Sequence, residues 1–235
     1  QPVPADRVFV LDFGAQYSQL IARKVREQGV YAEIVPGEIS AEALAQRGPK
    51  GIILSGGPAS VYEDGAPDCD PGIFALGVPV LGICYGLQLM VARLGGEVAG
   101  GGGREYGSAT VTWRGESPLS AGLPGEMACW MSHGDAARRL PDGFVSLATT
   151  DNCPEAAVGD VARRLYGVQF HPEVTHTPQG SALLANFVHG VCGCGNDWNM
   201  GSFVSHAVEA IRAQVGEGRV LCALSGGVDS AVLAA

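Results

Sequence analysis

The sequence predicts an α/β fold: a mostly parallel, mixed sheet with helices on both faces, followed by the first helix, strand and loop of a second α/β domain. Over the first hundred of the 235 residues, short apolar strands alternate with amphipathic helices. The strands are nearly continuous apolar runs, which is typical of sheets that are buried on both faces. Hydrophobic residues make up 46% of the chain and charged residues 17%, so there is enough apolar material for a core.

The elements follow one another in a regular order. We expect helices where apolar residues recur at helical spacing, with Ser40 as the N-cap of a short one, and strands where they run together or alternate. The expected strands are 7–12, 31–35, 51–54, 78–83, 109–113, 144–148, 165–170 and 219–224, and the expected helices are 18–28, a short one after Ser40, 85–94, 179–191 and 203–215. We therefore expect one domain over 7–191, a glycine-rich linker over 192–197, and the incomplete start of a second domain over 198–235.

Composition excludes several classes of function. The formal net charge of −9 argues against a nucleic-acid partner. The sequence contains no run of eighteen apolar residues, so we expect no membrane-spanning helix. Seven cysteines without a secretion signal or a clustered framework indicate a cytoplasmic protein with free thiols. Cys192 and Cys194 lack a second pair at zinc-site spacing, so we expect no metal site there.

Cys84 is the first candidate for chemistry. It lies in Gly82–Gly86 (GICYG), between a predicted buried strand and a predicted helix. Such a strand–turn–helix junction needs small flanking residues and pushes the side chain at its tip out over the sheet edge. A thiol at a helix N-terminus is also favoured as the thiolate, the nucleophilic form. The alternative is a buried structural cysteine.

His171 and Glu173 can serve as the base and the group that orients it. Pro172 favours an extended conformation at His171, which lets the carboxylate accept the imidazole N–H. A histidine and a glutamate two residues apart are common and are often only a surface pair. Combined with the turn at Cys84, they complete a nucleophile, a base and an orienting carboxylate. Leu54–Pro58 (LSGGP) follows a parallel strand, so its two glycines can offer backbone N–H groups to a substrate oxygen at the same sheet edge. The alternative for that segment is a simple turn.

Together the segments 54–58 (LSGGP), 82–88 (GICYGLQ) and 169–173 (QFHPE) resemble the class I glutamine amidotransferase family. The resemblance implies Cys84 as nucleophile, His171 as general base and then acid, and Glu173 as its orienting group. It also implies an oxyanion hole from the backbone N–H groups of Gly57 and Tyr85. Gln88 is then expected to help hold glutamine, which is cleaved through a glutamyl thioester with release of ammonia.

Further segments resemble one branch of that family, the GMP synthetases. These are residues 11–23 (LDFGAQYSQLIAR), 58–62 (PASVY), 104–107 (REYG), 130–135 (WMSHGD) and 171–177 (HPEVTHT). The resemblance implies that Ser132 and Gly134 contact the carboxylate end of glutamine through the backbone, and that Asp135 receives its α-ammonium group. The alternative is a polar turn without a ligand.

A second, independent signal is the segment 224–230 (LSGGVDS) near the end of the sequence. A glycine-rich turn between a strand and a helix presents N–H groups to an anion, and this one lacks the Gly-Lys-Ser/Thr ending of a Walker A loop. It resembles the pyrophosphate loop of N-type ATP pyrophosphatases, which implies contacts to ATP and Mg²⁺ from Ser225, Gly226, Gly227, Val228, Asp229, Ser230 and Ala231. For the complete enzyme, the resemblance to the GMP synthetases implies ATP-dependent amination of xanthosine monophosphate and a homodimer formed through a domain that these residues lack. For the 235 residues alone we expect glutaminase chemistry at most.

Three alternatives stay open at this point. One is another triad amidotransferase, serving anthranilate, carbamoyl phosphate or CTP synthesis, and another is a γ-glutamyl hydrolase of the same fold. Residues 225–230 argue against both, because neither needs an ATP loop of this type. The third is a non-catalytic, glutamine-binding regulatory subunit, against which the intact Cys84, His171 and Glu173 speak.

Overall fold

The computed structural model describes residues 6–15 and 17–220. The described residues divide into two compact units, one ending at Trp198 and one beginning at Asn199, and each is considered by itself. The expected strand at 219–224 and the loop at 225–231 lie largely or wholly outside the described residues, and residues 219 and 220 are not in a strand. No helix in the described ranges has the length and apolar character needed to cross a membrane.

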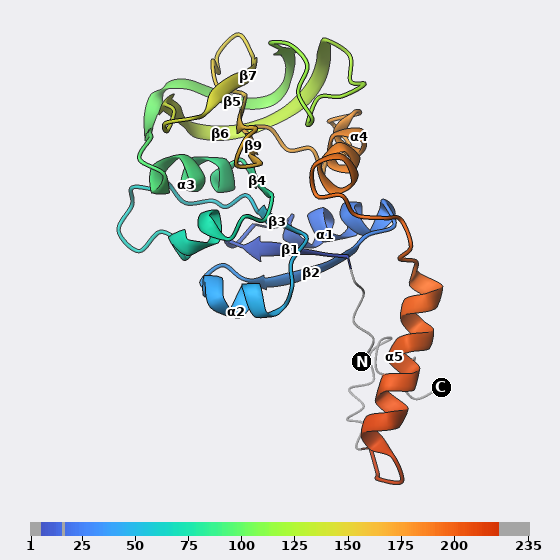
Figure 1. The fold of residues 1–235 in the computed structure, drawn as a ribbon. Helices are drawn as coiled ribbons and strands as arrows, with labels where there is room; N and C mark the ends of the chain where they lie inside the picture. The colour runs from blue at the N-terminus through green and yellow to red at the C-terminus, as the bar shows by residue number, and fades with distance from the viewer. Residues whose placement is uncertain (1–5, 16, 221–235) are drawn as a thin grey trace, which may run out of the picture. The chain divides into compact units, whose positions relative to one another are not determined.

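Nine strands in the described part of the chain form one sheet in the order β2-β1-β3-β4-β9-β8-β7-β5-β6 (Figure 1). The strands β2, β1, β3, β4 and β9 are parallel, and the other four are antiparallel. Their bounds are β1 Arg7–Asp12, β2 Tyr31–Pro36, β3 Gly51–Leu54, β4 Val80–Ile83, β5 Glu97–Trp113, β6 Glu126–Arg139, β7 Val145–Thr149, β8 Ala157–Asp160 and β9 Leu165–Val168. The expected mostly parallel, mixed sheet is confirmed.

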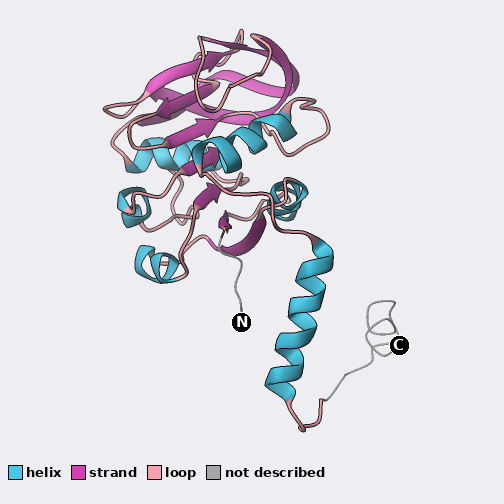
Figure 2. Ribbon diagram, turned by 45° about the vertical axis from the view of Figure 1, so that its right-hand side comes forward, coloured by secondary structure: helices cyan, strands magenta, loops and turns pink. Residues whose placement is uncertain are grey.

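Helices cover both faces of the sheet (Figure 2). They are α1 Ser18–Glu27, α2 Ala41–Gln46, α3 Tyr85–Arg93 and α4 Gly180–Ala185, with a 3₁₀ segment at Pro71–Ala75 and a π-helical turn at Asn186–Val191. Alternate residues of β1 show the two layers. Val8 and Val10 pack in the same apolar cluster as α1 and α4, whereas Phe9 and Leu11 pack in the cluster that contains α2 and α3.

Local chemistry explains where several elements begin and end. Ser40 caps α2 as expected, since its hydroxyl accepts a hydrogen bond from the Ala43 backbone N–H at 3.1 Å. Gly29 follows α1 with a φ of +73°, a conformation that costs glycine little. The prediction of one helix over 179–191 is wrong in one respect. The segment is α-helical only to Ala185 and continues as the π-helical turn Asn186–Val191.

The largest difference from the expected elements is the β5–β6 pair. The sequence indicated only residues 109–113 as a strand, but β5 begins at Glu97 and pairs with β6, which was not expected at all. An irregularity between Gly100 and Glu105 shifts the register of this pair. Residues 132–135 therefore lie within a strand and not in a turn.

Residues 192–197, expected as a linker, pack on the first unit. Cys192 and Cys194 are buried, the Gly195 N–H donates to Asp6 at 2.7 Å, and the Trp198 N–H donates to the Gly29 carbonyl at 3.0 Å. The second unit contains helix α5, Met200–Val215, where a helix was expected at 203–215. Val204, Val208 and Ile211 of α5 are exposed at helical spacing.

Gly86 sets how closely α3 approaches β3, because an added Cβ would overlap the Leu54 carbonyl oxygen. We expect Gly86→Ala to lower the free energy of unfolding by about 1–3 kcal/mol or more, the usual cost of overpacking a rigid site. Gly190→Ala is the control, since Gly190 is exposed and nothing lies within 4 Å of an added Cβ. Chemical denaturation of both variants tests this, and equal stabilities would contradict the packing argument.

Candidate active site

The sheet brings the predicted residues together at the carboxyl edge of its parallel strands. Cys84 directly follows β4 and is the N-cap of α3, with φ +51° and ψ −107°. A positive φ is rare for a residue with a Cβ, and strain of this kind clusters at functional sites. The turn leaves no room beside it, since a Cβ at Gly82 would lie 2.6 Å from the Leu87 backbone nitrogen. The glycines on each side of Cys84 therefore follow from steric need.

His171 and Glu173 lie on the segment that follows β9, the strand next to β4. The Nδ1 atom of His171 is 2.7 Å from the Glu173 Oε1 atom, and both side chains are buried. The backbone of His171 is fixed as well: its N–H donates to the Trp130 carbonyl at 3.0 Å, and its carbonyl accepts from the Thr177 hydroxyl at 2.7 Å. His171 is thus held in place by contacts of both its ring and its backbone.

Cys84 and His171 face one another across Gly56. A Cβ at Gly56 would lie 3.3 Å from His171 Cε1 and 3.8 Å from Cys84 Cβ. Since Glu173 occupies Nδ1, Nε2 is the ring nitrogen left to face the thiol. Burial by itself lowers the pKa of His171, but hydrogen bonds with Cys84 and Glu173 and the charges of both partners raise it to about 10. The raised pKa of His171 therefore favours a protonated imidazole beside the Cys84 sulfur at neutral pH.

The turn at Gly56 and Gly57 lies against the same junction. Ser55 fixes it, because its hydroxyl accepts from the Phe13 N–H at 3.1 Å and donates to the Gly56 carbonyl at 2.9 Å. A Cβ at Gly57 would lie 2.9 Å from the Phe13 carbonyl oxygen and 3.3 Å from Tyr85 Cγ. Tyr85 is the first residue of α3, where backbone N–H groups have no partner within the helix.

The remaining predicted residues come from α3 and β6. Gln88 is buried, and its Nε2 donates to the Asp135 carbonyl at 2.7 Å. The Ser132 carbonyl oxygen is 3.6 Å from Cys84 Sγ, and Gly134 lies between Ser132 and Asp135 on the same strand. Both carboxylate oxygens of Asp135 accept hydrogen bonds, from the Ser60 hydroxyl at 2.5 Å and from the Tyr62 hydroxyl at 2.6 Å.

Sequence reasoning did not single out three residues that contact this set. Gln169 is fully buried; its Nε2 donates to Cys84 Sγ at 3.6 Å, and its Oε1 accepts from Gln88 at 3.3 Å. Tyr17 packs edge-on against the His171 ring, with centroids 5.8 Å apart. Thr177 also accepts from the Trp130 N–H at 3.0 Å. All three residues lie in segments that the sequence analysis quoted, but nothing in the pattern indicated their partners.

Comparison with known proteins matches this chain to a family. Residues 9–191 match the family described as glutamine amidotransferase class-I. Two curated relatives named "GMP synthase [glutamine-hydrolyzing]" are similar to this chain. The one from Heliobacterium modesticaldum is 57% identical over 231 residues, and the one from Bacillus cereus (strain ATCC 10987 / NRS 248) is 56% identical over 229 residues. The alignments cover 98% and 97% of this chain, respectively, and 45% of each relative, so the chain spans less than half of their length.

Solved structures agree on the fold. A Thermoplasma acidophilum protein provisionally described as a GMP synthase subunit superimposes with a TM-score of 0.72 at 30% identity, covering 86% of this chain and 98% of that one. A glutamine amidotransferase from Thermotoga maritima gives a TM-score of 0.64 at 19% identity, covering 82% of this chain and all of that one. By its sequence match and by its fold, the chain belongs to the class I glutamine amidotransferase family.

Proposed function

We propose that residues 6–198 form the glutamine-hydrolysing part of a GMP synthase, with Cys84, His171 and Glu173 as the catalytic residues. The observation that supports this best is the convergence of the Cys84 thiol, the His171 imidazole and the Glu173 carboxylate at one sheet edge. The curated relatives named as glutamine-hydrolysing GMP synthases support the choice of pathway. Cleavage of glutamine supplies ammonia to the rest of the protein.

In this proposal each chemical step has a group that carries it out. The Cys84 thiolate attacks the side-chain amide carbon of glutamine, and the backbone N–H groups of Gly57 and Tyr85 donate to the oxyanion that forms. The His171 imidazolium then gives its proton to the leaving nitrogen, and ammonia departs from a γ-glutamyl thioester. His171, now neutral, takes a proton from water, whose oxygen attacks the thioester and releases glutamate. Loss of one oxyanion donor typically costs about 3 kcal/mol of barrier.

Recognition of glutamine follows from the charges at the site. Asp135 offers a carboxylate that Ser60 and Tyr62 hold in place, which suits the α-ammonium group of the substrate. Backbone groups of Ser132 and Gly134 are then available to its carboxylate end. Gln88 acts mainly through Asp135, because its amide donates to the Asp135 carbonyl.

The second half of the reaction belongs to the whole protein. We propose that Ser225–Ala231, which lie outside the described residues, bind the phosphates of ATP together with Mg²⁺, by resemblance to ATP pyrophosphatase loops. ATP would activate xanthosine monophosphate for attack by ammonia. The homodimer and the amination site would reside in the part of the relatives' length that this chain does not span. We also propose a reducing, cytoplasmic location, since the cysteines in the described part of the chain are free.

Ammonia release from glutamine tests the catalytic assignment. We expect Cys84→Ala to lower the rate by on the order of 10⁴-fold or more, because no other group forms the thioester. Cys69→Ala is the control, since it removes a buried thiol from outside the site. A Cys84→Ala form as active as the parent would overturn the proposal, and a folded parent without any turnover would favour the regulatory alternative.

The charge of Glu173 is expected to keep His171 protonated. Glu173→Gln should lower the pKa of His171 from its raised value of about 10, because the carboxylate's hydrogen bond and charge both favour the imidazolium. An NMR titration of the His171 ring measures this directly, with the exposed His176 as a reference in the same spectra. An unchanged pKa would show that Glu173 does not act on the imidazole.

A further inference from the structure

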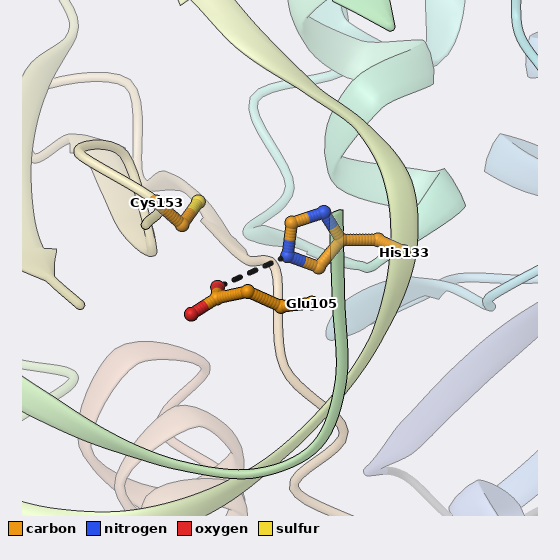
Figure 3. Close-up of side chains that lie close together, drawn as sticks. All are labelled: Glu105, His133 and Cys153. Carbon is orange, nitrogen blue, oxygen red and sulfur yellow. Dashed lines mark hydrogen bonds and ion pairs between the residues drawn. The ribbon is translucent and has the colours of Figure 1, made fainter. Parts of the chain in front are cut away.

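Two motif residues outside the triad lie buried side by side. Glu105 of β5 and His133 of β6 are partners in the strand register, and they are only 7% and 4% exposed. The His133 Nε2 atom lies 3.3 Å from the Glu105 Oε2 atom, the contact drawn as a dashed line in Figure 3. Neither residue has a role in the chemistry proposed above, although both occur in segments that the sequence singled out.

Both ring nitrogens of His133 face an oxygen atom. Its Nδ1 atom lies 3.0 Å from the Asp135 backbone carbonyl oxygen, which can only accept a hydrogen bond. Its Nε2 atom faces the carboxyl group of Glu105. Both ring nitrogens therefore face acceptors, and an imidazole that donates from both nitrogens carries a positive charge.

The partners of Glu105 are those of an ionised carboxylate. The Thr150 hydroxyl lies 3.0 Å from each carboxylate oxygen, and the Asn152 amide donates to Oε1 at 3.4 Å. Together with the His133 N–H, these donors surround an oxygen pair that needs no proton of its own. Burial of both charges is tolerable only because they are paired and hydrogen-bonded.

This pair connects directly to the glutamine site. The Asp135 carbonyl that accepts from His133 also accepts from Gln88 at 2.7 Å. His133 lies between Ser132, whose carbonyl is 3.6 Å from Cys84 Sγ, and Gly134. The position of the Ser132–Asp135 segment relative to Cys84 therefore depends on how His133 is held.

We propose that Glu105 and His133 form a buried carboxylate–imidazolium pair that positions the Ser132–Asp135 segment for binding of glutamine. Both are positioning residues, because neither reaches the reacting atoms. The inference rests on the proposed glutaminase function, and it adds to that function the interaction that fixes the substrate-binding strand.

Cys153 lies close enough to raise the question of a metal. Potential ligand atoms of Glu105, His133 and Cys153 all lie within 4.8 Å of one another (Figure 3). However, burial raises the pKa of the Cys153 thiol to about 12, and the charge of Glu105 acts in the same direction. Thr150 and Asn152 already occupy the carboxylate, so the donor set fits a charged pair with a neutral thiol beside it.

Kinetics of glutamine hydrolysis test the positioning role in the 235-residue chain. We expect Glu105→Gln and His133→Asn each to raise KM for glutamine about 10- to 100-fold and to change kcat by much less, since misplaced substrate contacts weaken binding. The double variant should raise KM by less than the product of the two single effects, because each substitution removes the same interaction. Cys153→Ala is the control, with KM within about twofold of the parent. If the two single effects on KM multiply in the double variant, or if the substitutions change only kcat, the proposal is overturned.

Binding can be measured without turnover by calorimetry with glutamine in a Cys84→Ala background, where the same loss of affinity is expected. A parent chain that binds glutamine while Glu105→Gln binds it equally well would overturn this inference alone. A folded parent that neither binds nor hydrolyses glutamine would overturn the proposed function as well.

The charge of the pair is measured in the parent chain, so it does not depend on whether a variant folds. Nitrogen NMR of the His133 ring should show both nitrogens protonated at neutral pH. A neutral ring would contradict the pair. Zinc retained at one equivalent by the parent and lost in Cys153→Ser would also contradict it, by showing that a metal occupies this position.

Discussion

The backbone conformation of Cys84 is the constraint on which the rest of the site depends. A φ of +51° at a residue with a Cβ persists only where the surroundings hold it, and here β4 and α3 hold it from both sides. Gly82 and Gly86 allow that close approach because a Cβ at either position would overlap backbone atoms. The sulfur is thereby placed at the sheet edge that His171 and Gly56 also reach. The geometry of the proposed active site is thus a consequence of how β4 meets α3.

The two halves of the sheet contribute different parts of the site. The parallel half supplies Cys84, His171 and the turn at Gly56 and Gly57, as expected for strands whose carboxyl ends share an edge. The antiparallel half supplies β6, where the Ser132 carbonyl contacts Cys84 and the Asp135 carbonyl contacts Gln88. Buried polar contacts, and not apolar packing alone, join the halves at this point. Glu105 contacts His133 of β6, and the hydroxyls of Ser60 and Tyr62 donate to Asp135, much as Glu173 contacts His171 on the other side of the site.

The parallel half could be predicted from the sequence because its signals are local. Apolar runs, the Ser40 cap and the glycines around Cys84 each act within a few residues, and the structure has the corresponding elements where they were expected. Strand β6 could not be predicted, because its pairing with β5 is a long-range interaction and its polar residues look like a turn. The contact of Gln169 with Cys84 and that of Glu105 with Thr150 likewise join residues more than 40 positions apart. Such pairs appear only once the chain is folded.

Covalent trapping is the most direct test of the central claim that Cys84 is a nucleophile aimed into a glutamine site. A glutamine analogue with an electrophilic carbon in place of the side-chain amide should modify the folded chain once. Mass spectrometry of the digested protein should locate the adduct on Cys84, and excess glutamine should protect against it. An adduct on another cysteine, or an unmodified Cys84 in a chain that binds the analogue, would contradict the account.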